Sequence, residues 1–145
     1  RKGSDKTIIK EIQISYKQDW QKEHWNAITS SYNSSPYFEY YKDELYTLFN
    51  KKEKLLINFN HKLQLIILKF LEEKKTISTN TEYLHRGSFS DLRNHKWDLR
   101  QQERYEQVFM QKHGFIPNLS ILDLLFNLGP ESKDYLKNID ISIDI

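Results

Sequence analysis

The sequence contains no cysteine, and this absence excludes several kinds of protein. Without thiols the chain can form neither a disulfide scaffold nor a CxxC redox site, and it cannot bind zinc through thiolates. A charge excess of one sign is also missing, because 22 lysines and arginines face 20 aspartates and glutamates, a formal net charge of +2. Such a balance gives no electrostatic reason to bind nucleic acid or an anionic membrane, and we expect no nucleic-acid partner.

Long hydrophobic runs and the common catalytic motifs are missing as well. The longest mostly apolar run, residues 63–71, is interrupted by Gln64 and Lys69. It is much shorter than the ~20 residues that cross a bilayer, so we predict no membrane span. There is no GxGxxG, Walker, HExxH, GxSxG or DxD motif. The five histidines form no i, i+4 pair on one helical face, so we predict no metal site.

Helical periodicity predicts three helices in the first half of the chain. The first runs from a cap at Ser15 to Asn33, the second begins at Pro36, and the third covers residues 55–71. The third helix has the widest apolar face. We therefore expect it to be the central helix of the core.

Short strands complete the predicted fold. Apolar residues alternate partly over 8–15 and again over 105–109, and residues 139–145 could add a third strand. Residues 76–104 sustain neither a helical nor a strand period and are predicted to form a long loop. We therefore predict an α+β fold, a predominantly helical single domain over residues 1–145 with a small sheet.

One carboxylate is expected in very apolar surroundings. A helix capped by Asn118 or Ser120 and ended by Gly129 is apolar on every side except the line of Ser120, Asp123 and Asn127. Such a helix is buried, and a carboxylate in it needs a partner because an unpaired interior charge is costly. Two interpretations remain open. Asp123 pins backbone groups of the segment 105–117, or it faces a polar pocket as an acid or base.

His24 is the candidate acid or base outside that helix, since it shares a helical face with Trp20. The alternative is a core histidine bonded to a backbone carbonyl. Ten of the 20 aromatic residues lie within residues 16–49. They could stack on sugar rings, but at helical spacing such residues more often form a core.

Three arginines recur every seven residues, at Arg86, Arg93 and Arg100. In a helix they would share one face and could clamp a phosphate through bidentate hydrogen bonds. Nearby acidic residues leave a local excess of about one charge, and the alternative is a solvated loop.

A long motif fills the C-terminal third. It reads Tyr105-x-Gln107-x-Phe109, then His113-Gly114-Phe115-x-Pro117-Asn118-Leu119-Ser120-Ile121-Leu122-Asp123, and it continues to Gly129-Pro130-Glu131. This stretch resembles the C-terminal signature of the WbqC-like proteins of bacteria. Residues 12–41 are similar to the middle section of that family, and so long a motif is hard to obtain by chance.

The resemblance implies a role connected with surface polysaccharide such as O-antigen, and with nucleotide-sugar chemistry in the cytoplasm. Family members carry an N-terminal segment ahead of the position where this chain starts. We therefore expect the chain to be the middle and C-terminal part of a WbqC-like domain. The surface left by that segment could receive a protein partner or a second copy.

From the resemblance we expect a transferase or accessory enzyme that acts on a nucleotide sugar or a sugar-derived substrate. His24 and Asp123 would be its catalytic residues. The side chains predicted to bind the substrate are Trp20, Tyr105, Gln107, Asn127, Arg93 and Arg100. The alternative is a non-catalytic helical interaction module, and binding of single-stranded RNA through the arginine-rich loop ranks last.

Overall fold

The computed structural model describes residues 8–80 and 102–139. Within these ranges the chain forms helices and single helical turns joined by loops. In chain order the elements are η1 (Ile9–Glu11), α1 (Trp20–Tyr32), α2 (Phe38–Phe49), α3 (Leu56–Phe70), α4 (Met110–His113), α5 (Ile121–Leu128), η2 (Gly129–Glu131) and α6 (Ser132–Asn138).

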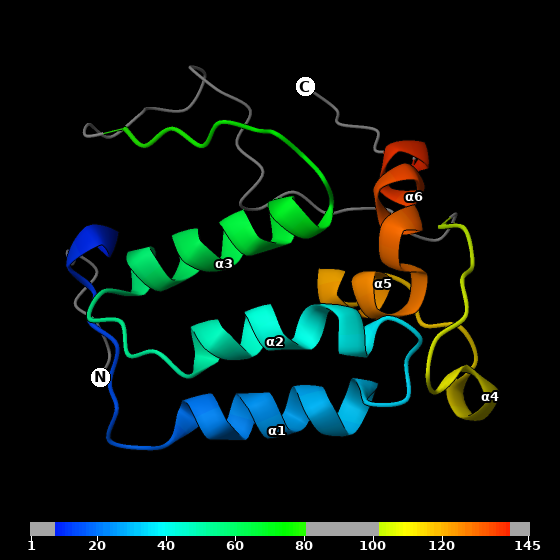
Figure 1. Ribbon diagram of the computed structural model, residues 1–145, viewed down its shortest axis with the longest axis horizontal. Helices are drawn as coiled ribbons and strands as arrows, with labels where there is room; N and C mark the ends of the chain where they lie inside the picture. Colours follow the sequence, from blue (N-terminus) through cyan, green and yellow to red (C-terminus); the bar gives the residue numbers. More distant parts are fainter. Residues whose placement is uncertain (1–7, 81–101, 140–145) are drawn as a thin grey trace.

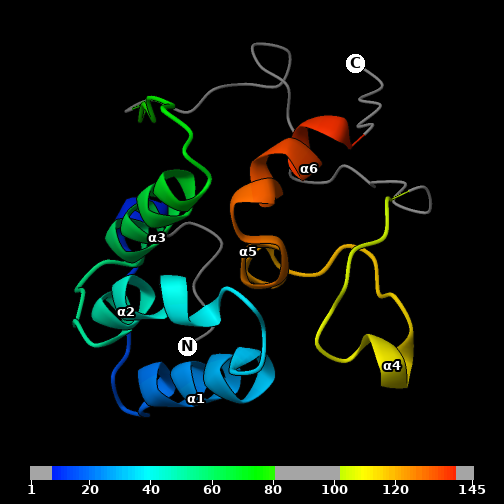
Figure 2. The ribbon, with the colours of Figure 1, turned by 45° about the vertical axis from the view of Figure 1, so that its right-hand side comes forward.

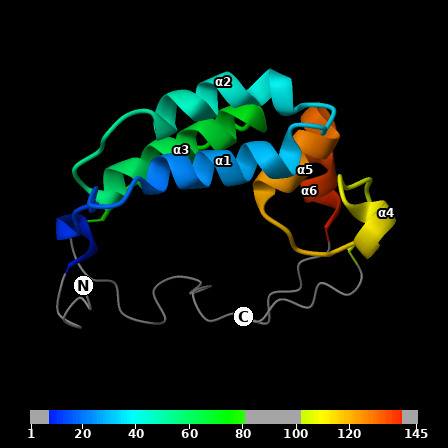
Figure 3. The same cartoon turned by 90° about the horizontal axis from the view of Figure 1, so that it is seen from below.

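The three longest helices, α1, α2 and α3, lie side by side, and α5 and α6 lie across one end of the group (Figure 1). The view in Figure 2 shows the same separation between the three-helix group and the C-terminal helices. Seen from below, α2 is displaced from α1 and α3 (Figure 3), and it packs against both. The same helix also contacts α5, so α2 joins the two parts of the fold.

The core is therefore centred on α2. Phe38 and Leu45 of α2 are fully buried against Leu125 and Phe126 of α5. The prediction that α3 is the central helix is wrong, because α3 buries only Phe59 fully and leaves its other apolar side chains half-buried or exposed. The reason is position: α2 has neighbours on three sides, whereas α3 packs against α2 and η1.

The residues that the structure describes contain no β-sheet, so the predicted α+β class with a small sheet is wrong and the fold is helical. Over residues 8–15 the chain forms η1 and then a single antiparallel bridge between Gln13 and Leu55. Two backbone hydrogen bonds of 3.0 Å flank this bridge. The pairing extends no further because Leu56 already begins α3.

The second predicted strand, residues 105–109, has the expected alternation but no neighbouring strand among the described residues. Tyr105 and Gln107 are buried, while Glu106 between them is exposed. The side-chain amide of Gln107 forms two hydrogen bonds with the backbone of Ile116. A sheet strand would pair through its own backbone instead. The alternation therefore reports an extended segment packed against the C-terminal part of the fold, which a period of two does not distinguish from a sheet strand.

Parts of two further predictions lie outside the described residues. The third strand is expected over 139–145, of which only Ile139 is described, and the predicted loop 76–104 includes residues 81–101, which are not. Residues 76–80 and 102–104 contain no helix or strand. None of the helices in the described part of the chain combines the length and the apolar character that a membrane crossing requires.

The two ends of α5 hold that helix in place. Ser120 caps its start, as predicted, by accepting a backbone N–H of the first turn at 3.2 Å. The helix ends at Gly129, whose φ is 56° and where a Cβ would lie 2.5 Å from the Tyr37 ring. The Tyr37 N–H in turn donates to the Phe126 carbonyl at 3.0 Å. Glycine is required at this crossing of α5 with the turn between α1 and α2, and the crossing fixes Asp123 beside the end of α1.

Candidate functional site

The buried carboxylate of the described residues belongs to Asp123 of α5, which is 3% exposed. The Tyr105 hydroxyl donates to its Oδ2 at 2.6 Å, and Gln107 Nε2 donates to the same oxygen at 3.2 Å. Tyr32, at the end of α1, lies near enough to the carboxylate for its negative charge to help raise the pKa of the Tyr32 hydroxyl. We call Tyr32, Tyr105, Gln107 and Asp123 the Asp123 cluster.

Gln107 links this cluster to the backbone. Its amide donates to the Ile116 carbonyl and accepts from the Ile116 N–H, each at 2.9 Å. These two bonds close the loop that contains α4, so Asp123 reaches the backbone of segment 105–117 through Gln107 and not directly. Asn127 turns back on its own helix, because its Nδ2 donates to the main-chain oxygen of Asp123 at 2.8 Å.

Burial and the Asp123 charge keep the two tyrosines of the cluster protonated. Burial, together with the nearby negative charge of Asp123, raises the pKa of Tyr32 from 10.0 to about 12. The pKa of Tyr105 is raised as well, first by burial and then by its hydrogen bond to Asp123. Both hydroxyls are therefore donors at neutral pH. The carboxylate is satisfied by groups of the protein itself, as buried polar groups in folded proteins are.

A cavity of about 650 Å³ lies beside the cluster without reaching the carboxylate. Tyr105 and Tyr135, whose ring centroids are 5.3 Å apart, form part of its wall. The other side chains on the wall include four acids, Glu103, Glu106, Glu131 and Asp134. Asp123 and Gln107 line neither this cavity nor the larger opening described next. Protein groups therefore separate the carboxylate from both.

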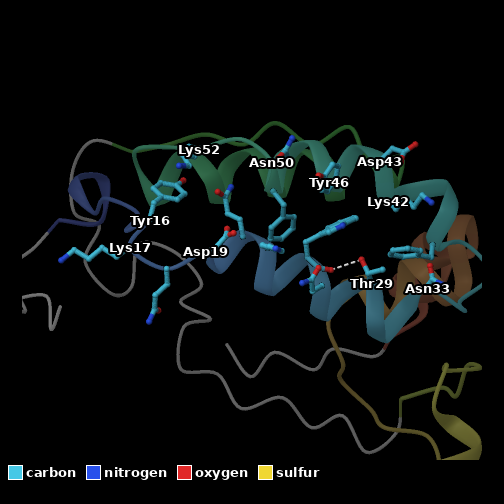
Figure 4. Close-up of a pocket in the computed structure, with 17 residues that line it drawn as sticks. Tyr16, Lys17, Asp19, Thr29, Asn33, Lys42, Asp43, Tyr46, Asn50 and Lys52 are labelled. Carbon is cyan, nitrogen blue, oxygen red and sulfur yellow. Dashed lines mark hydrogen bonds between the residues drawn. The ribbon is translucent and has the colours of Figure 1, made fainter.

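The larger opening is a groove of about 940 Å³ between α1 and α2, lined from residues 16–33 and 38–52 (Figure 4). We call it the α1–α2 groove. The Trp25 and Tyr46 rings meet in it with centroids 5.1 Å apart and planes inclined by 50°. Trp25 also packs against Phe38 and Phe49, with centroids 6.4 and 6.0 Å away. Tyr46 is 46% exposed, so a firmly held aromatic surface faces the solvent.

Cations outnumber acids around the α1–α2 groove. Its lining includes four lysines and two aspartates, namely Lys17, Lys22, Lys42, Lys52, Asp19 and Asp43. Lys42 forms an ion pair with Glu39. The Lys52 ammonium lies 5.4 Å from the centre of the Tyr16 ring and forms no ion pair with any residue the structure describes. Figure 4 places Lys52 and Tyr16 at one end of the groove and Lys42 and Asp43 at the other.

The predicted site residues fall into two groups. Tyr105, Gln107 and Asp123 meet through their side chains, and Asn127 joins them through a backbone contact. His24 lies on α1, eight residues before Tyr32, which is roughly 12 Å along an α-helix. The structure therefore does not bring His24 to the Asp123 cluster.

His24 and Trp20 form a pair at the start of α1. Their ring centroids are 5.3 Å apart, and His24 is exposed. Trp20 packs against Phe49 and Phe59, and its buried indole N–H has no hydrogen-bond partner among the described residues. Neither ring lines the α1–α2 groove.

The predicted phosphate clamp cannot be placed, because Arg86, Arg93 and Arg100 lie outside the described residues. Over residues 8–80 and 102–139, no three histidine, aspartate or glutamate side chains lie close enough together to hold a metal ion.

The sequence indicated the aromatic segment 16–49 as one of two alternatives, a surface for stacking sugar rings or a core, but it did not identify the groove itself. Most aromatic residues of segment 16–49 serve the core, and Phe38, Tyr41 and Phe49 are buried. Tyr40 and Tyr46 are different, because both lie off the buried stripe of α2 and are exposed, and of these two Tyr46 lines the groove. An aromatic residue off the stripe is the signal that could have indicated a binding surface.

Comparisons with known proteins place the chain among uncharacterised relatives. The model of the WbqC-like protein family matches residues 1–93 and 81–135. The uncharacterized protein Rv1507c of Mycobacterium tuberculosis is 26% identical over 153 residues, which cover 82% of this chain. The chain spans 65% of the length of that relative. No solved structure matches the chain.

Proposed function

The chain belongs to the WbqC-like protein family, and on this premise we propose that it serves the synthesis of a bacterial surface polysaccharide such as O-antigen. It acts there as a transferase or accessory enzyme, and it binds a nucleotide sugar or another sugar-derived substrate in the α1–α2 groove. Nucleotide sugars are cytoplasmic metabolites, so the protein works in the cytoplasm. The polysaccharide role comes from the family resemblance, and the placement of the substrate comes from the groove.

The observation that carries the substrate site is the half-exposed Tyr46 ring beside the part-buried Trp25 ring, in an opening of ligand size. Sites for small molecules commonly enclose ~300–1,000 Å³, and the groove has about 940 Å³. Tyr46 offers an exposed ring on which a sugar or a base can stack, and Trp25 supports that ring from the core side. Lysines and amides around them supply charge and hydrogen bonds for the polar part of such a substrate.

The predicted catalytic residues take different places in this proposal. Asp123 has a structural role in this proposal, since its carboxylate is held by Tyr105 and Gln107 and lines neither cavity. His24 is exposed on α1 outside the α1–α2 groove and is kept as the proposed acid or base. Replacing His24 by glutamine tests that role through the pH dependence of turnover.

A binding experiment tests the substrate site. The full chain is titrated with a panel of nucleotide sugars, sugar phosphates and free sugars, and the indole signals are followed by NMR. Tyr46→Ala should weaken binding at least about tenfold, because the stacked ring is lost. Tyr40→Ala is the matched control: Tyr40 lies on the same helix, is 79% exposed and does not line the groove.

The control variant should bind like the parent chain. Absence of binding across the panel at millimolar concentration would overturn the proposed substrate site. Deletion of the gene, with complementation by either tyrosine variant, tests the polysaccharide role separately. The expected result is that Tyr40→Ala restores the surface polysaccharide and Tyr46→Ala does not.

One observation favours the second candidate function, a helical interaction module. Apolar side chains at η1 face the solvent: Ile8, Ile9 and Ile12 are 53%, 59% and 36% exposed. Exposed apolar side chains grouped in this way are typical of protein contact surfaces. Ile9→Lys should then abolish a self-association seen by sedimentation of the parent chain, and a parent chain that is monomeric at all concentrations removes the case for a second copy.

A further inference from the structure

We propose that the α1–α2 groove binds a nucleoside phosphate in one orientation, with the phosphate beside Lys52 and Tyr16 and the base against Trp25 and Tyr46. This inference rests on the proposed function and names its substrate class, a nucleotide-linked ligand instead of a neutral sugar. It is carried by a difference between the two ends of the groove (Figure 4).

The loop that presents Lys52 is held rigidly. The Tyr16 hydroxyl donates to the Glu53 carbonyl at 2.9 Å and accepts from the Glu53 N–H at 2.8 Å. Gln21 of α1 donates to the Lys51 carbonyl at 2.7 Å. Three hydrogen bonds therefore fix the backbone on both sides of Lys52 before any ligand arrives. A cation on a fixed backbone loses less conformational entropy when it binds an anion.

The charge of Lys52 is also available. The neighbouring Glu53 forms its ion pair with Lys62. Lys52 itself has no acidic partner among the residues that the structure describes, and its ammonium rests 5.4 Å from the Tyr16 ring. A phosphate can take up this cation without breaking an existing ion pair.

The opposite end of the groove has the reverse balance. Its lysine, Lys42, is already paired with Glu39, and Asp43 lies beside it on the groove wall. An anion at this end would compete with Glu39 and meet the charge of Asp43. The phosphate is therefore assigned to the Lys52 end, where Lys17 also lies on the wall and the two lysines outnumber the aspartate at that end, Asp19.

The middle of the groove suits a planar ring with polar edges. Trp25 is held by Phe38 and Phe49 and meets Tyr46 in the groove. The side chains of Asn26, Asn33 and Asn50 line the groove and make no hydrogen bond to a described residue. A nucleobase stacks on the aromatic rings, and free amides can bond to the edge of the base or to the ribose.

The test compares nucleotide sugars with smaller compounds that contain only the nucleoside, the sugar or the phosphate groups. Calorimetry measures the binding of each compound to the full chain. The nucleotide sugars are uridine diphosphate glucose and its guanosine, cytidine and thymidine counterparts. The other compounds are uridine, glucose, pyrophosphate and a uridine oligonucleotide. We expect at least one nucleotide sugar to bind at least about tenfold tighter than uridine, glucose or pyrophosphate, since each fragment lacks part of the contacts.

Variants at the lysines test where the phosphate of the ligand binds. Lys52→Gln should weaken binding of the nucleotide sugar about tenfold, as expected for loss of a charged hydrogen-bond donor. Lys54→Gln is the matched control, because it removes the same charge from the same loop but does not line the groove. Amide spectra of both variants establish that they are folded.

The outcomes distinguish this inference from the proposed function. Glucose that binds as tightly as any nucleotide sugar, with no effect of Lys52→Gln, overturns the inference and leaves the proposed function standing. Pyrophosphate that binds as tightly as the nucleotide sugar overturns the placement of the base. The oligonucleotide binding more tightly than every nucleotide sugar overturns the inference in favour of an RNA strand. No binding by any compound overturns both.

Discussion

The Asp123 cluster and the α1–α2 groove both gather aromatic and polar side chains, but their polar groups differ in what they contact. In the cluster, donors and acceptors meet one another, with Tyr105 and Gln107 bonded to the carboxylate. In the groove, Lys52 and the asparagine side chains have no polar partner among the described residues. Satisfied buried groups stabilise a fold, whereas exposed groups without partners are available to a ligand.

The long motif of the C-terminal third supplies most of the Asp123 cluster. Its polar residues Tyr105, Gln107, Asp123 and Asn127 are bonded to one another or to the backbone. A conspicuous polar motif can therefore mark how a segment is held, while the ligand binding that we propose depends on less conspicuous residues elsewhere, such as Tyr46.

The largest expected effect comes from removing the acceptor of the cluster. Asp123→Ala removes the acceptor of the buried Tyr105 hydroxyl and of one hydrogen bond from the Gln107 amide, and we expect the free energy of unfolding to fall by about 3 kcal/mol or more. Urea unfolding measures the loss. Glu106→Ala, at an exposed neighbour, is the control and should change stability by less than about 0.5 kcal/mol. A loss below about 1 kcal/mol for Asp123→Ala would show that the cluster is not what holds this region.

A smaller effect is expected at the crossing that positions the cluster. In Gly129→Ala the new Cβ would meet the Tyr37 ring at 2.5 Å and would sit at a φ of 56°, so we expect a loss of about 2–3 kcal/mol. Gly114→Ala is a matched control, because Gly114 also has a positive φ, 69°, but has no atom within 4 Å of the added Cβ. The difference between the two variants isolates the packing against Tyr37. Equal losses would mean that backbone strain alone requires the glycine.

The smallest effect is a dependence of stability on alkaline pH. The pKa of Tyr32 is raised from 10.0 to about 12 in the folded chain. The protonated hydroxyl is therefore favoured by folding, and its contribution is complete below pH 10 and is lost as the pH rises through 12. The urea midpoint should fall between pH 9 and pH 11.5, and it should fall less in Tyr32→Phe, which has no proton to lose. Parallel pH curves for the two proteins would remove Tyr32 from the cluster.

Local signals in the sequence predicted much of the helical structure. The predicted helix over 55–71 is observed as α3 (Leu56–Phe70), and the cap at Ser120 and the end at Gly129 are confirmed. These features depend on periodicity and on side chains within a few positions of one another. The predicted start of the first helix at Ser15 is wrong, since α1 begins at Trp20. Tyr16 bonds instead to the distant Glu53, a contact that no local pattern contains.

The remaining errors have the same origin in long-range contacts. A strand needs a neighbouring strand, and residues 105–109 have their alternation without one among the described residues. The order of burial among helices depends on which helix lies between others, so the wide apolar face of α3 did not make it central. The groove exists only where α1 and α2 meet, and sequence spacing within either helix does not reveal it.

The central claim is that the Asp123 cluster holds the fold while the groove binds the ligand. The most direct test is the affinity of Asp123→Asn for the nucleotide sugar that binds the parent chain best. It is measured by calorimetry at low temperature on protein whose amide spectrum shows it to be folded. The account predicts an affinity within about twofold of the parent value, since well-separated sites act independently. A loss of about tenfold or more in the folded variant would contradict it and would place Asp123 in the binding machinery.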